Sequence, residues 1–444
     1  MNRKLLFITL LVALGLSSCS KTDTPVQVAD TRTPSFKLLQ QKIITPVCAQ
    51  CHTAGAQFAI ESELILDPTV AYANLVGIKS HQKNASADGL LRIKKGFADS
   101  SLFYLKVHGA PNGKSYGNIM PLGYAPLSSG QQKFIHDWIN AGAPDTGVVA
   151  DATLLDDTTK SPVADFVPLP PPTAGTGYQV SIGKFDVAPN FEREVFEFRK
   201  LGNTQPIFVN RIHSRIRTNS HHLALYAYPQ GATLPQYDKI RDIRNPDGTY
   251  NYTELTGPDR LFIGGSMIEE QEYSFPPGVA LPLPANIGID VNTHFINRTN
   301  SKLPGECYAN FYTVNPSEVK NIAVPFFNVN NSLNLPAGKQ TVVSDNGWLN
   351  PNNKDVNVFL LTSHNHEWGQ KYQIYIQGGT RNGELVYESR DWAQPAMQSY
   401  DPPIVLHPGE GLRSVVTYFN NTDHKLIFGL KSTDEMDVIY GYYY

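Results

Sequence analysis

Two histidines and a methionine in the C-terminal part of the chain carry donor atoms that bind transition metals. His364 and His366 follow a run rich in β-branched and apolar residues, 356–361. Alternate residues of a strand point to one face, so the two imidazoles can share a metal. Met436 would add a thioether, and two nitrogens with one sulfur suit copper, particularly Cu(I), better than hard cations. The pattern predicts a copper site.

A second set of histidines lies upstream. His221 and His222 are adjacent at the start of one strand-like run, and His294 lies in another. Neighbours on a regular strand face opposite ways, so both can bind one metal only if the strand is irregular or begins there. A single histidine on a strand is more often structural than a ligand, but two sets and a methionine favour metal binding.

The segment Cys48-Ala-Gln-Cys51-His52 has the c-type haem attachment pattern. Its two thiols can add to the haem vinyl groups, and the adjacent histidine is placed to be the proximal iron ligand. A zinc site would need a second Cys or His pair nearby, and none lies at the usual spacing. The motif therefore predicts covalently bound haem c.

Helical patterns flank this motif. Apolar residues recur at helical spacing before it, and Ser128 with Gln131 predicts a capping box at the start of a later helix. Met120 precedes a proline between the two helices. Together these features resemble the small cytochrome c fold, in which a loop methionine is the distal iron ligand. The resemblance implies Met120 in that role; the alternatives are His108, His81 or an open position.

The N-terminus carries an export pattern. Two basic residues precede an apolar run, 5–16, that is too short to span a bilayer as a helix. Leu-Ser-Ser-Cys19 resembles a bacterial lipobox, in which the cysteine is lipidated, and Ser20 is not the aspartate that retains such proteins at the inner membrane. We expect a signal peptide over 1–19, a flexible tether over 20–34, and an outer-membrane lipoprotein facing the periplasm or the cell surface. The alternative is an ordinary cleaved signal.

The composition sets the expected fold class. A chain of 444 residues exceeds one ordinary core, and abundant Gly (34) and Pro (32) with few charged residues (17%) favour β-rich domains. The net charge of -3 offers no basic surface for nucleic acid. We expect a small all-α cytochrome c domain followed by two all-β, jelly-roll-like antiparallel sandwiches. The expected boundaries are 35–145 for the cytochrome c domain, 146–177 for a Pro/Gly linker, and 178–320 and 321–444 for the sandwiches.

The C-terminal part is similar to the type II copper monooxygenases, the family of peptidylglycine α-hydroxylating and dopamine β-monooxygenases. Those enzymes carry a His-His pair and a later His for one copper, then His-x-His and a Met for a second. The order here is the same: His221, His222 and His294, followed by His364, His366 and Met436. An acidic pair precedes Met436, and Tyr440 stands where the family has a tyrosine.

The resemblance implies a two-copper oxygenase that hydroxylates a C–H bond of a small substrate with O₂. The copper of His364, His366 and Met436, with Tyr440 beside it, would bind O₂ and substrate. The copper of the other three histidines would store and deliver an electron. An external reductant is needed, and the attached haem is expected to supply it; the alternative is that the haem serves an unrelated redox partner protein.

Two departures limit the resemblance. Cys307 is the only cysteine in the C-terminal two-thirds, so the disulfides of the vertebrate enzymes are absent, and Thr362 replaces the arginine that binds a peptide carboxylate in amidating members. The substrate is therefore not expected to be a glycine-extended peptide. The alternative function is a non-catalytic envelope protein for electron transfer or copper binding. A zinc hydrolase is disfavoured because no carboxylate lies at zinc-site spacing and the methionine fits poorly.

Overall fold

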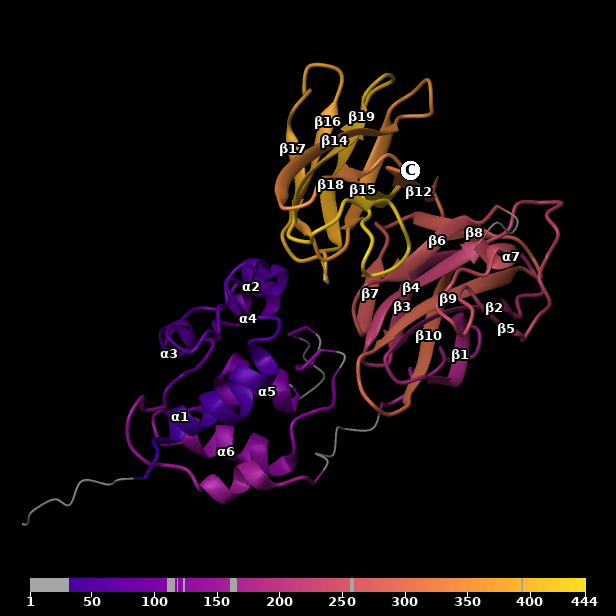
Figure 1. The fold of residues 1–444 in the computed structure, drawn as a ribbon. Helices are drawn as coiled ribbons and strands as arrows, with labels where there is room; N and C mark the ends of the chain where they lie inside the picture. The colour runs from indigo at the N-terminus through magenta and orange to yellow at the C-terminus, as the bar shows by residue number, and fades with distance from the viewer. Residues whose placement is uncertain are drawn as a thin grey trace, which may run out of the picture.

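The computed structural model describes residues 32–109, 116–117, 119–122, 124–159, 166–255, 259–392 and 394–444 (Figure 1). The predicted signal peptide, Cys19 and most of the tether lie outside these residues. Within the described chain, no helix is both long and apolar enough to cross a membrane. Most of the regular structure is β-strand.

The N-terminal region contains short helices joined by long irregular segments. The longest α-helix, α6, has 12 residues, and isolated β-bridges join Val76 to Ile93 and Lys79 to Leu91. The helices are α1 (Ser35–Leu39), which runs into the π-helix η1 (Gln40–Cys48), α2 (Gln57–Ser62), α3 (Ala71–Leu75), α4 (Lys83–Ala87), η2 (Ala98–Ser100), α5 (Leu102–His108), α6 (Ser129–Asn140) and η3 (Ala152–Asp156).

The predicted fold class is therefore wrong, because this region is not an all-α domain. The two amphipathic patterns do form helices: Leu39 and Ile139 are fully buried, and the capping box of Ser128 and Gln131 is present. Between them, segments rich in Gly, Asp and Ser end each helix within one or two turns, since these residues favour turns and caps over helix interiors. The helical spacing of apolar residues near 36–43 and 135–139 therefore does not predict the structure of the segment between them.

Two sheets form the first β unit, and all their strand pairs are antiparallel except β8-β11, which is parallel. One sheet has the strand order β1-β10-β3-β8-β11, with β7 also paired to β3, and the other has the order β5-β2-β9-β4-β6. The elements are β1 (Gly177–Val187), β2 (Phe191–Lys200), β3 (Ile207–Ile216), β4 (Ser220–Ala227), β5 (Ile240–Asp242), α7 (Tyr252–Leu255), β6 (Leu261–Ser266), β7 (Glu270–Ser274), β8 (Val279–Leu283), β9 (Gly288–Asn297), β10 (Leu303–Val314), η4 (Pro316–Glu318) and β11 (Asn321–Ile322). Ile212 and Phe311 of one sheet share a core with Leu225 and Ile289 of the other.

The second β unit has two four-stranded sheets, β12-β21-β15-β18 and β14-β19-β16-β17, and a small pair, β13-β20. Its strands are β12 (Val324–Val329), β13 (Asn334–Leu335), β14 (Lys339–Leu349), β15 (Val356–His364), β16 (Gly369–Gln377), β17 (Leu385–Ser389), β18 (Gln398–Leu406), β19 (Gly411–Asn420), β20 (Leu426–Ile427) and β21 (Val438–Tyr443). Val358, Tyr372 and Val416 are buried between these sheets. Alternation along the strands places their apolar residues inside.

The two β units are joined through β15 and β21. Phe359, Tyr440 and Tyr442 belong to the hydrophobic core of the first unit. The Tyr442 hydroxyl donates a hydrogen bond of 2.6 Å to the carbonyl of Ile263 on β6. This contact fixes the histidine-bearing strand β15 against the first unit.

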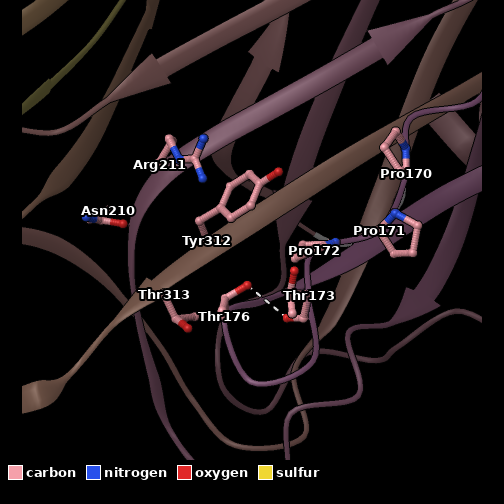
Figure 2. A pocket seen from close by; sticks show the side chains of 9 residues that line it. All are labelled: Pro170, Pro171, Pro172, Thr173, Thr176, Asn210, Arg211, Tyr312 and Thr313. Carbon is pink, nitrogen blue, oxygen red and sulfur yellow. Dashed lines mark hydrogen bonds between the residues drawn. The ribbon is translucent and has the colours of Figure 1, made fainter.

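The proline-containing segment before β1 lies on the first unit. Gln179 donates to the carbonyl of Leu169 at 2.8 Å, and Asn310 donates to that of Pro170 at 2.9 Å. A pocket between this segment, β3 and β10 is lined by Arg211 and Tyr312, whose ring lies 3.5 Å from the guanidinium carbon (Figure 2). No histidine or cysteine lines this pocket among the described residues.

Candidate metal centre

Five histidines of the described chain converge on one site. The donor nitrogens of His221, His222 and His294 lie within 4.8 Å of one another, and so do those of His221, His364 and His366. His221 belongs to both groups, and its ring centroid lies 5.4 Å from that of His364. The two histidine sets predicted from the sequence are therefore neighbours in one cluster.

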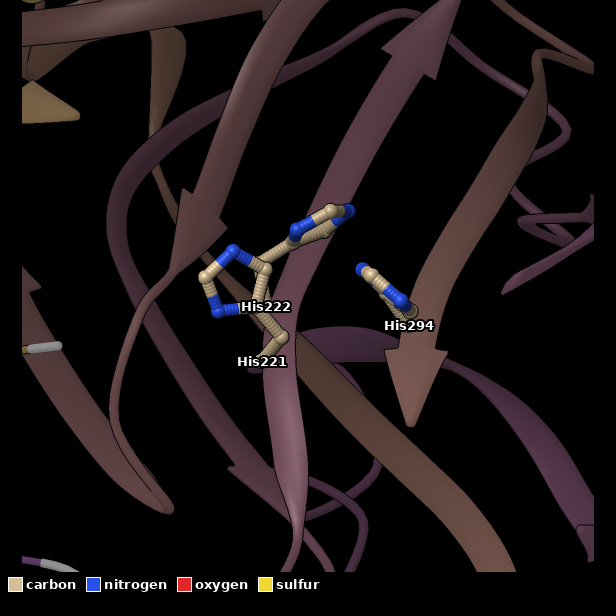
Figure 3. Close-up of side chains that lie close together, drawn as sticks. All are labelled: His221, His222 and His294. Carbon is tan, nitrogen blue, oxygen red and sulfur yellow. The ribbon is translucent and has the colours of Figure 1, made fainter. Parts of the chain in front are cut away.

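An irregularity at the start of β4 directs the first group inward. Ser220 pairs with Phe295 and His222 with His294, so the register shifts at His221, which has no partner of its own on β9. A bulge of this kind lets adjacent residues leave strict alternation. The rings of His221 and His222 lie 5.4 Å apart, with His294 facing them from β9 (Figure 3). The irregular strand that two adjacent histidine ligands require is present.

A tight turn positions the second pair. β15 ends at His364, and the Asn365 side chain donates to the carbonyls of His366 at 2.9 Å and Gly369 at 3.3 Å. A Cβ atom on Gly369 would lie 2.0 Å from Asn365 Nδ2, so a larger residue here would displace the Asn365 side chain. The rings of His364 and His366 lie 5.1 Å apart.

Several imidazole nitrogens at the centre have no protein partner. Among the described residues, His221 Nε2, His364 Nδ1 and His294 Nδ1 are buried without a hydrogen bond, whereas His294 Nε2 lies 3.3 Å from a carboxylate oxygen of Glu192. Burial, reinforced by the neighbouring histidines, lowers the pKa of His221 and His364 well below the ordinary value, and burial lowers that of His366 to about 4. Neutral imidazole is the metal-binding form. Unpaired buried polar atoms cost about 1–3 kcal/mol each, so a bound cation would satisfy an otherwise unfavourable arrangement.

Outer contacts orient the rings. His366 Nδ1 lies 2.9 Å from the carbonyl of Asp434, and His222 Nε2 lies 2.9 Å from Asn292 Oδ1. Each contact leaves the other ring nitrogen available, as is typical of metal-ligating histidines.

Two carboxylates that were not anticipated from the sequence lie beside the cluster. Glu194 Oε1 is 3.5 Å from His222 Nε2, and Glu192 Oε2 is 3.3 Å from His294 Nε2. Burial opposes ionisation, but contacts with the histidines and other partners hold the pKa of both carboxyls at about 2. Glu192 and Glu194 are two residues apart on β2, which pairs with β9, the strand of His294. Two acidic residues at this spacing point to one face of a strand, and this pattern was the only sign of them in the sequence. The sequence shows no carboxylate at zinc-site spacing from the histidines, and these two reach the cluster because β2 pairs with β9.

Met436 lies on the segment that contacts His366. Tyr418 donates a hydrogen bond of 2.7 Å to the Met436 carbonyl, and Asp434 is the residue whose carbonyl meets His366. Tyr440 has different surroundings. Its ring packs 4.5 Å from Phe262 in the core between the two β units, and it pairs with Thr362 of β15.

The haem-motif residues line a cavity of about 630 Å³. Cys48, Cys51, His52, Met120 and His81 all face it. His108 lies elsewhere: its ring stacks on Tyr104 at 4.9 Å, and its Nδ1 is 2.9 Å from Gln132 Oε1. The distal-ligand candidates that share the cavity with His52 are thus Met120 and His81.

The cavity suits a large, mostly apolar ligand. Its volume falls in the range of small-molecule and cofactor sites, and apolar side chains such as Leu66, Leu75 and Phe103 make up much of its wall. Burial lowers the pKa of His52 to about 4, which keeps its imidazole neutral for iron binding. Residues from both β units, including Ile268 and Met397, complete the wall.

Comparisons with known proteins assign no family. No family model and no curated protein matches the chain. Solved structures with partial similarity include "Structure of infectious bursal disease virus Gx strain" (10% identity, 62% of this chain, 72% of that chain, TM-score 0.16) and "11S globulin from Wrightia tinctoria reveals auxin binding site" (8% identity, 60% and 79%, TM-score 0.13). At these TM-scores the similarities carry no argument about fold or function.

Proposed function

We propose that the chain is a copper-dependent monooxygenase that uses O₂ to hydroxylate a C–H bond of a small molecule. The observation that carries the proposal is the five-histidine cluster, in which His221, His294 and His366 are buried and several ring nitrogens have no partner in the described chain. The order of its residues, with Met436 behind them, matches the type II copper monooxygenases. Copper, when bound, would supply one-electron redox chemistry and a site for O₂.

The shared histidine suggests how the donors divide. A neutral imidazole offers one lone pair, so His221 completes only one group at a time. If His221 binds the same metal ion as His222 and His294, then Met436 is the third donor beside His364 and His366. Because the donor nitrogens of the two groups approach so closely around His221, the two metal positions would be neighbours. Glu192 and Glu194 would hold the rings of the first group in place.

The haem proposal rests on the shared cavity. Cys48 and Cys51 would attach haem c, His52 would be the proximal ligand, and Met120 the distal ligand. Lys106 and Arg92 also line the cavity and would supply positive charge to a bound haem, whose carboxylates are negative. We further propose that lipidated Cys19 anchors the protein in the outer membrane and that a redox partner protein reduces the haem.

Metal content tests the proposal. Protein purified with haem and loaded with copper should hold about two copper ions and one haem per chain. Copper and haem are measured by elemental analysis and by haem absorbance, and O₂ uptake is then screened against candidate small substrates. One copper ion or none, or two copper ions without O₂ uptake on any substrate, would favour the non-catalytic envelope protein.

A further inference from the structure

Two aromatic side chains connect the haem-motif cavity to the histidine cluster. The ring centroid of Phe58 lies 6.4 Å from that of His52 and 5.4 Å from that of Trp392. Trp392 in turn lies 6.0 Å from His221. Neighbouring rings along this row are therefore close enough to be in contact or nearly so.

The loop that carries Trp392 forms part of the cavity wall. Asp391 and Gln394 line the cavity together with Phe58, and Gln394 N donates to Asp391 Oδ1 at 2.8 Å. Trp392 is 5% exposed, and its indole nitrogen is buried without a hydrogen-bond partner in the described chain. The N–H of a buried tryptophan usually donates a hydrogen bond. Trp392 lacks one, so its position between the cavity and His221 is maintained by packing of the ring.

The N-terminal region is held at this position by further contacts. Asn421 of the second β unit donates to the carbonyl of Gly55 at 3.4 Å. Burial raises the pKa of Cys51, and the charges of Arg298, which lowers it, and of Glu367, next to His366, which raises it, also reach the thiol. The haem motif thus lies against the same loops that carry the cluster.

We propose that Phe58 and Trp392 form the electron path from the haem to the histidine cluster, entering at His221. The inference rests on the proposed function. In each transfer one electron leaves a ferrous haem and reduces one cupric ion to cuprous; no bond forms or breaks, and a one-electron donor protein reduces the haem again. Tunnelling falls off more steeply across empty space than across packed atoms, and the two rings fill the intervening space.

Flash reduction of the haem in copper-loaded, oxygen-free protein tests the path. Haem reoxidation, followed by absorbance, reports the transfer rate independently of hydroxylation. Trp392→Leu opens a gap beside His221 and should slow transfer by about tenfold or more, whereas Trp392→Phe keeps an aromatic ring and should retain most of the rate. Trp348→Leu is the matched control, since Trp348 stacks on Phe326 in the second β unit, and its rate should equal that of the unsubstituted protein.

Copper and haem contents are measured on every variant. If Trp392→Leu loses copper, the transfer rate is measured in Phe58→Leu instead, because Phe58 lines the haem cavity. An unchanged rate in a fully loaded Trp392→Leu or Phe58→Leu protein would overturn the path and leave the oxygenase proposal intact. A chain without bound copper would overturn both, whereas a loaded chain whose haem never reduces copper would overturn the path and the haem's role as reductant.

Discussion

At the scale of single residues, unsatisfied nitrogen atoms distinguish the histidine cluster from structural histidines. His407 shows the contrast: its Nδ1 lies 2.8 Å from Asp355 Oδ1 at the surface. His294 is fully buried, and its Nδ1 has no hydrogen bond in the described chain, although its Nε2 lies 3.3 Å from Glu192 Oε2. A buried imidazole nitrogen without a hydrogen bond destabilises the fold unless a ligand binds it.

Replacing His294 should remove one copper ion. His294→Ala deletes a donor of the first group, and the remaining pair binds copper too weakly to retain it through dialysis against a mild chelator. Copper content should fall from about two to about one per chain, because the His364, His366 and Met436 donors are untouched. His407→Ala is the control and should keep both ions. Full copper content in His294→Ala would contradict the assignment.

Copper should stabilise the folded chain. A ligand that binds only the native state adds about 2.7 kcal/mol of stability at a free concentration 100 times its Kd. Removal of copper by a chelator also leaves His221 Nε2 and His364 Nδ1 buried and unpaired. Thermal unfolding of chelated and copper-loaded protein should therefore differ by several degrees. Identical unfolding temperatures would argue against binding at this cluster.

At the scale of elements, two strand irregularities place the donors. The bulge at His221 and the turn after β15 each depart from regular pairing, and each directs a histidine into the cluster. The bulge was predictable from the sequence, because two adjacent histidines can bind one metal only on an irregular strand. The sequence did not show the turn, because the Asn365 and Gly369 contact depends on the path of the backbone.

Gly369→Ala should damage the second group. The new Cβ would overlap Asn365 Nδ2, so the Asn365 amide must leave the carbonyls of His366 and Gly369, and overpacking of this kind costs about 1–3 kcal/mol. His366 moves with the turn, so we expect loss of the copper ion bound by His364 and His366, measured as copper content and by the Cu(II) EPR spectrum. Gly183→Ala on β1 is the control, because no atom lies within 4 Å of the position that its new methyl group would take.

At the scale of the whole molecule, the sequence predicted donor types and a β-rich chain but not how the parts meet. The two histidine groups lie about 70 residues or more apart in sequence, and their proximity depends on β15 and β21 packing against the first β unit. No local pattern contains that information. The prediction of an all-α N-terminal domain was wrong for a related reason. The helical patterns at its two ends carry no information about the irregular segments between them.

The contact between the β units should control the cluster. Tyr442→Phe removes the 2.6 Å hydrogen bond to the carbonyl of Ile263 and the 3.4 Å contact with the Tyr273 hydroxyl, at a cost of about 1–3 kcal/mol. The loss falls on the junction between the units, so the copper-free variant should unfold at lower denaturant concentration and bind copper more weakly, with His221 less firmly held against His364. Both are measured by denaturant titration and by competition with a copper chelator. Tyr375→Phe, on β16 of the second unit, is the control and should change neither. Weaker stability with unchanged copper affinity in Tyr442→Phe would show that the two histidine groups do not depend on this junction.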